Sequence, residues 1–199
     1  VFAGEYAAHP KGVENGPLEN NWDAALSEAA FMTGLERNAD VVHLTAYAPL
    51  MAHEEGWQWA PDLIWFNNLE VYGTPNYYVQ KLFSNNSGTD LLKITENGKP
   101  LIGQKELYVS AVKDENTNEL IIKAVNTSPE NLTVIVSSKG GALNGKGLIE
   151  TLSHQDLSTT NSFEIPYNIG VSISNFEIID GKMQIELLAQ SFNIIKLKK

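Results

Sequence analysis

Glu5 is the residue with the clearest capacity for chemistry. It follows a short apolar run, Val1 to Ala3, and stands between Gly4 and the aromatic Tyr6. In domains built from alternating strands and helices, the carboxyl ends of parallel strands form the catalytic face, where a carboxylate can serve as nucleophile or as acid/base. An ordinary surface glutamate at a strand end is the competing interpretation, and the local pattern leaves both open.

A second candidate is the aromatic segment 52–60, which holds Trp57 and Trp59 beside His53. Indole faces that stack on sugar rings would explain such a density of aromatics. Tryptophans that plug the end of a barrel or a domain interface would explain it equally well.

The sequence predicts no metal site and no cofactor. The four histidines show no ligand spacing, and His43 lies in an apolar run that favours a buried core residue. Segment 114–118 lacks the glycine of a calcium loop and is better interpreted as a hairpin turn. No phosphate-binding loop, dinucleotide fingerprint or nucleophile elbow is present.

The elements that must position these residues fall into two halves. Residues 1–88 hold 11 acidic and three basic residues and all four tryptophans, whereas residues 89–199 hold 13 acidic residues and 11 lysines. Such a shift in composition predicts a domain boundary near the polar stretch 84–89.

The first half predicts alternating strands and helices. Apolar residues at helical spacing indicate a helix over 22–37, with Asn20 or Asn21 as its N-cap and Asn38 at its end. Segment 41–47 is β-prone throughout, as in a strand buried on both faces, and Pro75 can start a helix that reaches about residue 85. This order is typical of a piece of a parallel α/β domain.

The second half predicts an antiparallel β-sandwich. Short β-rich runs alternate with turn signals, of which Asp180-Gly181 is the strongest. The expected strands are 105–112, 120–126, 132–138, 148–153, 171–178, 183–188 and 192–197.

The net charge of −10 argues against a nucleic-acid or membrane-surface partner, and no apolar run is long enough to span a bilayer. The chain starts at Val1, without a signal peptide, so we expect it to be part of something longer. Its compartment stays open, and an exported or periplasmic parent is compatible with the sequence.

Five segments in order resemble the α-L-arabinofuranosidases of glycoside hydrolase family fifty-one. They are VFAGEYA (1–7), AALSEAAFMTGLERNAD (24–40), YAPL (47–50), WAPDLI (59–64) and YGTPNYYVQ (72–80). The remainder resembles the family's C-terminal β-sandwich in architecture.

This resemblance implies a fold and a role for Glu5. Residues 1–88 would be the last two β/α units of a TIM barrel, and residues 89–199 a jelly-roll-like sandwich. Glu5 would be the nucleophile of a retaining double displacement on arabinose-containing plant polysaccharides such as arabinan. Tyr6, Tyr47, Trp57 and Trp59 would line the substrate site.

The acid/base glutamate of the family follows an asparagine, and here Asn118-Glu119 lies in a turn of the second half. The chain therefore lacks the acid/base, and we expect it to be inactive alone and to self-associate through exposed barrel surface. The alternatives are a carbohydrate-binding or structural sandwich module, and a different retaining glycosidase of the same clan.

Overall fold

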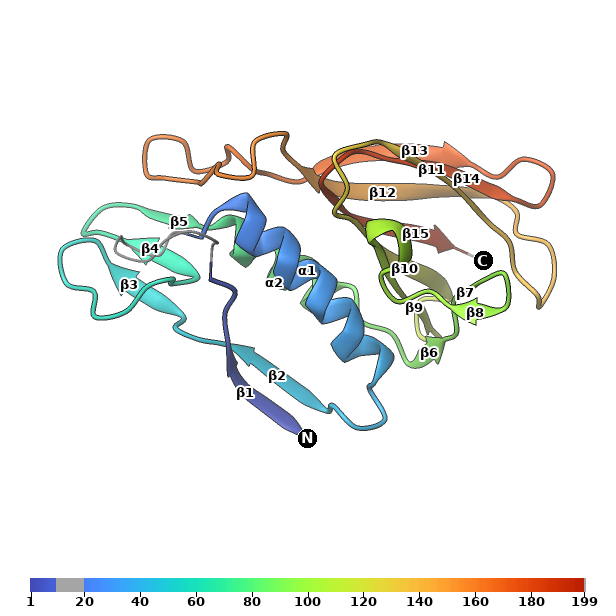
Figure 1. Cartoon of the computed structure of the whole chain (residues 1–199), viewed down its shortest axis with the longest axis horizontal. Helices are drawn as coiled ribbons and strands as arrows, with labels where there is room; N and C mark the ends of the chain where they lie inside the picture. The colour runs from blue at the N-terminus through green and yellow to red at the C-terminus, as the bar shows by residue number, and fades with distance from the viewer. Residues whose placement is uncertain (10–19, 199) are drawn as a thin grey trace.

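A computed structural model describes residues 1–9 and 20–198. Most of the regular secondary structure in these residues is β-sheet, and two α-helices accompany it (Figure 1). The elements of the first half are β1 (Phe2–Tyr6), α1 (Trp22–Arg37), β2 (Leu44–Tyr47), β3 (Met51–His53), β4 (Ile64–Phe66), β5 (Val71–Gly73) and α2 (Pro75–Asn85). Those of the second half are β6 (Asp90–Leu92), β7 (Thr95–Glu96), β8 (Lys99–Pro100), a 3₁₀ turn (Gln104–Glu106), β9 (Leu107–Asp114), β10 (Glu119–Asn126), β11 (Leu132–Val136), β12 (Lys146–Ser153), β13 (Ser172–Glu177), β14 (Met183–Leu187) and β15 (Ser191–Lys198).

The second half forms two main antiparallel sheets and the short antiparallel pair of β7 with β8. The larger has six strands in the order β13-β12-β15-β10-β9-β6, and the smaller pairs β11 with β14. Side chains such as Ile122, Ile195 and Ile185 fill the space between them. The strands expected from the sequence are present, and the turns at 114–118 and 180–181 connect neighbouring segments, with a bridge between Ile179 and Lys182. The jelly-roll assignment stays a prediction.

The two helices cover the other face of the six-stranded sheet (Figure 1). Phe83 of α2 stacks on Phe192 of β15, with ring centroids 5.0 Å apart. Successive residues of a strand point to opposite faces, so Ile121 packs under the helices while Ile122 packs against the second sheet. Burial on both faces explains the nearly continuous apolar runs of β10 and β15.

Both helices begin and end where the sequence predicts. The Asn21 side chain accepts a hydrogen bond from the Ala24 amide at 3.0 Å, and Thr74 caps the helix that begins at Pro75. A capping oxygen satisfies an amide that has no partner within the first turn, which fixes the start of the helix.

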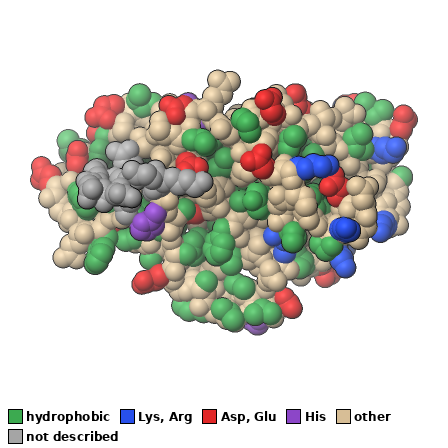
Figure 2. Space-filling view, in the orientation of Figure 1, with side chains coloured by type: hydrophobic (Ala, Val, Ile, Leu, Met, Phe, Trp, Pro, Cys, Tyr) green, Lys and Arg blue, Asp and Glu red, His purple; other side chains and the backbone are tan. Residues whose placement is uncertain are grey.

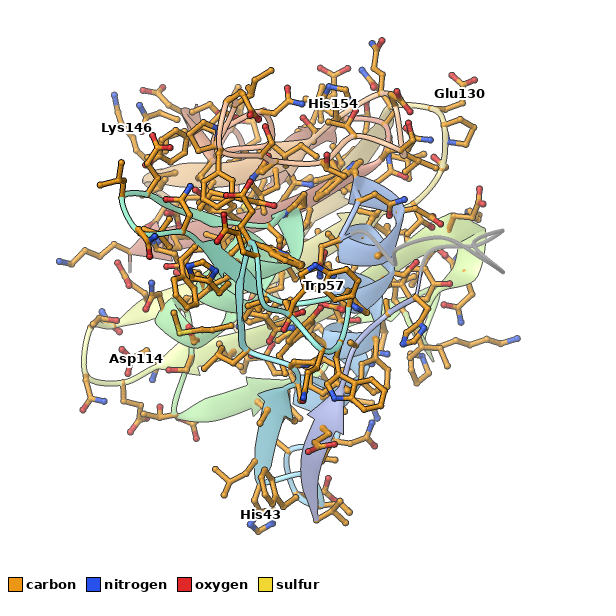
Figure 3. The ribbon with its side chains drawn as sticks, turned by 90° about the vertical axis from the view of Figure 1, so that its left-hand side faces the viewer. His43, Trp57, Asp114, Glu130, Lys146 and His154 are labelled. Atoms are coloured by element: carbon orange, nitrogen blue, oxygen red, sulfur yellow. The ribbon has the colours of Figure 1, made fainter. Side chains whose placement is uncertain are left out.

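The strand expected over 41–47, as one buried on both faces, is shorter and more exposed than predicted. The amides of Val41 and Val42 donate to the Asn38 carbonyl in a turn, and β2 begins at Leu44, parallel to β1. The expectation of a buried core histidine at His43 was wrong. His43 is exposed at the far end of the β1–β2 pair (Figure 3), one residue before β2 begins.

The division at residue 88 stays a prediction, because one hydrophobic cluster joins both halves. On the face shown in Figure 2, Lys and Arg side chains gather over the sandwich end, in keeping with the uneven charge. Within the described ranges, neither helix is long and apolar enough to cross a membrane.

Candidate functional site

Glu5 lies at an irregularity in the pairing of β1 with β2. Ala3 pairs with Thr45 and Tyr6 with Tyr47, so Gly4 and Glu5 together oppose a single residue of β2. An extra residue of this kind is a β-bulge, a feature found next to active sites because it redirects a side chain. Glu5 is exposed. The structure thus presents this carboxylate at a specialised point of the strand.

Tyr6, the next residue, packs inward. Its hydroxyl donates to Gln80 Oε1 at 2.9 Å, and its ring contacts Phe31 of α1 and Tyr47 of β2. Burial raises the pKa of Tyr6 most, and the charge of Glu28 raises it further. Tyr6 therefore joins the strand to both helices, and its contact with substrate stays a prediction.

Tyr47 is almost completely buried beside Tyr6. Its hydroxyl accepts a hydrogen bond from Asn20 Nδ2 at 2.7 Å. Burial raises the pKa of Tyr47 strongly, and the charges of Glu28 and Asp62 act in the same direction. The structure thus brings Tyr6 and Tyr47 together, as neighbours in one packed cluster.

Trp57 and Trp59 lie in the loop between β3 and β4. Figure 3 shows Trp57 on the end of the molecule that faces the viewer. They are 46% and 71% exposed, and Trp57 makes an edge contact with Trp65. Both interpretations of this loop, a sugar platform or a plug covered by further protein, need exposed rings in this chain.

A groove of about 550 Å³ lies between β2, β4 and α2. Tyr47, Leu63 and Gln80 are among its lining residues, whereas Glu5 is not. Sequence reasoning did not predict this groove, because its walls come from segments that are distant in sequence.

Sequence reasoning also missed Glu28. This glutamate of α1 is 2% exposed, and its two oxygens accept hydrogen bonds from the Ala8 amide and from Gln80 Nε2. Burial raises its pKa to about 7, although the hydrogen bonds from Ala8 and Gln80 and the nearby amide of Asn76 act in the opposite direction. Its spacing in the sequence was the available signal: Glu28 follows Ala25 by three residues and so falls on the apolar, buried side of the helix.

The described residues contain no group of three or more His, Asp or Glu side chains that could hold a metal ion. The candidate residues named above supply carboxylates, phenols and aromatic faces.

Comparison with known proteins identifies the class. Residues 4–191 match the family described as the α-L-arabinofuranosidase C-terminal domain. α-L-Arabinofuranosidase 1 of Arabidopsis thaliana is 35% identical over 205 residues, which cover 100% of this chain and 29% of that protein. An extracellular exo-α-L-arabinofuranosidase of Streptomyces chartreusis is 58% identical over 88 residues, 44% of this chain and 10% of its own length.

A solved structure agrees. An arabinose-bound α-L-arabinofuranosidase of glycoside hydrolase family fifty-one superposes with a TM-score of 0.85 and 25% identity, over 96% of this chain and 31% of that one. This chain belongs to the α-L-arabinofuranosidases of that family, as their C-terminal domain. It spans less than a third of the length of these two full-chain relatives.

Proposed function

We propose that this chain is the C-terminal part of a retaining α-L-arabinofuranosidase and that Glu5 is its nucleophile. The observation that carries the proposal is the exposed Glu5 at a bulge of β1, in a sequence that matches the family from residue 4 onward. In this proposal β1 and β2 are the seventh and eighth strands of a TIM barrel.

In the proposed reaction, Glu5 attacks the anomeric carbon and the bond to the leaving oxygen breaks as an acid protonates that oxygen. Water then releases arabinose, with the same acid now acting as base. A retaining enzyme needs its two carboxyl groups about 5–5.5 Å apart. Glu28, the buried carboxyl group behind β1, hydrogen-bonds the protein itself, so we assign the acid/base to residues outside this chain.

The substrate class that we propose is arabinose-containing oligo- or polysaccharide, from which the enzyme releases non-reducing terminal arabinofuranose. Trp57 and Trp59 supply exposed rings that suit sugar stacking. A purely carbohydrate-binding sandwich has less support. Of the five aromatic residues after position 88, only Tyr167 is largely exposed, at 75%, whereas a binding face needs a row of such rings.

The test uses the full-length enzyme that contains this segment. Glu5→Ala should abolish turnover of an aryl α-L-arabinofuranoside, and added azide should restore part of the rate with inverted product configuration. Glu115→Ala, a glutamate exposed on the β9–β10 hairpin, is the control and should keep full activity. The 199-residue chain alone should show no hydrolysis.

Near-native activity of Glu5→Ala, or azide rescue with retention, would show that Glu5 is not the nucleophile. Hydrolysis by the 199-residue chain alone would show that the acid/base lies within it.

A further inference from the structure

The hydrogen bonds of Glu28 link α1 to the strand that carries Glu5. Glu28 Oε1 accepts from the Ala8 amide at 2.8 Å, and Oε2 accepts from Gln80 Nε2 at 3.3 Å. Gln80 in turn accepts from the Tyr6 hydroxyl at 2.9 Å through its own Oε1. One buried carboxylate therefore restrains the chain at Tyr6 and at Ala8, directly after Glu5.

This arrangement has a cost that packing alone does not explain. Glu28 is 2% exposed, and none of the ion pairs of the described residues includes it. A buried carboxylate without a cation is unfavourable, and a neutral side chain of the same shape would pack as well. Such a cost is commonly found at functional sites, where geometry is maintained at the expense of stability.

We propose that Glu28 is a positioning residue, which as a carboxylate acceptor fixes the bulged end of β1 and so the orientation of Glu5. This inference rests on the proposed function of Glu5 as nucleophile. Displacement of a reacting group by about 1 Å can lower a rate about 100-fold, so a restraint on the adjacent residues bears directly on turnover.

The direction of the hydrogen bonds explains why charge matters here. Ionised Glu28 accepts from both Ala8 and Gln80, which leaves Gln80 Oε1 free to accept from Tyr6. A protonated Glu28, or a glutamine in its place, instead presents a donor to Gln80. The amide of Gln80 must then turn over, and its bond with Tyr6 is reversed.

The side chains that face Glu28 do not account for a change of charge near neutral pH, so we assign the expected pH dependence to the ionisation of Glu28 itself. Tyr6 comes from β1 and Tyr47 from β2, and burial raises the pKa of both hydroxyls, so they are neutral. Asp62, between β3 and β4, acts on Tyr47, and α2 contributes the uncharged Asn76 and Gln80.

The test is Glu28→Gln in the full-length enzyme. Above pH 7 we expect kcat to fall at least tenfold with KM within twofold, while the melting temperature is unchanged or higher because a buried charge is removed. In the wild type, kcat should rise with pH through about 7, as Glu28 ionises, and this limb should be absent from the variant. Tyr6→Phe should also lower kcat, and its effect should not add to that of Glu28→Gln.

Glu36→Gln is the matched control, a glutamate on the same helix that pairs with Lys123 instead of β1. It should change stability but leave kcat within twofold. Wild-type kcat in Glu28→Gln, together with an inactive Glu5→Ala, would overturn this inference and leave the proposed function standing. A fall in kcat matched by Glu36→Gln, or accompanied by a lower melting temperature, would show a merely structural role and overturn it too. An active Glu5→Ala would instead overturn the proposed function.

Discussion

Lys123 of β10 and Glu36 of α1 form an ion pair between the sandwich and the helical layer. The Lys123 side chain is completely buried, and its Nζ lies 2.5 Å from Glu36 Oε1. The Ser110 hydroxyl of β9 donates to the other carboxylate oxygen at 2.6 Å, and the neighbouring Arg37 donates to the Val109 carbonyl. Adjacent residues of one helix thus bond two strands of the six-stranded sheet.

Breaking this pair from one side should be costly. Lys123→Met leaves Glu36 without its cation at a largely buried site, so we expect a loss of about 3–5 kcal/mol in the free energy of unfolding. The double variant Lys123→Met/Glu36→Gln should recover most of that loss, because no unpaired charge is left. Urea unfolding of the three proteins measures both effects.

The control is Lys146→Met, which removes an ion pair with Glu177 on the exposed surface. It should leave the urea midpoint unchanged. If Lys123→Met were as mild as this control, the buried pair would not hold the two layers together.

Stability should also depend on pH through Glu28. Burial raises its pKa from 4.5 to about 7 in the folded chain, so the folded state holds a proton that the unfolded state has released between these values. The contribution of Glu28 to the free energy of unfolding is therefore complete below pH 4.5 and is lost as pH rises through 7. It amounts to about 3 kcal/mol in total.

Urea unfolding of the 199-residue chain at several pH values, compared with Glu28→Gln, isolates this contribution. The difference in the free energy of unfolding between the two proteins should change by about 3 kcal/mol between pH 4.5 and 8, and the variant should be favoured at high pH. Parallel pH profiles would contradict the raised pKa.

Local signals made much of the fold predictable. The helix over 22–37 follows from apolar spacing and from Asn21 and Asn38 at its ends, and the strands of the sandwich follow from β-rich runs between turns. Each of these depends on residues that are near one another in sequence.

Long-range contacts account for what was missed. The helices pack on a sheet whose strands follow much later, and Glu36 finds Lys123 87 residues away. The bulge at Glu5 exists only relative to β2, so the sequence of β1 alone does not specify it. Lys123, a lysine within the apolar run of β10, indicated that a buried acidic partner exists. The sequence did not indicate which acidic residue this partner is.

Asn161, in the segment between β12 and β13, ties the sandwich to the first half. It is 3% exposed, and its Nδ2 donates to the carbonyls of Gly73 and Ile169 while its Oδ1 accepts from the Ile169 amide at 2.8 Å. The segment also reaches the start of α1, where the Trp22 amide donates to the Thr159 carbonyl.

Asn161→Ala leaves buried backbone groups without partners, so it should cost about 2–3 kcal/mol in the free energy of unfolding. Asn168→Ala, in the same segment but exposed, should have little effect. Amide exchange should then accelerate at Ile169 and Trp22 in Asn161→Ala but not in Asn168→Ala. Equal exchange in the two variants would mean that the apolar contacts of Ile169, not the asparagine, hold this segment on the helical layer.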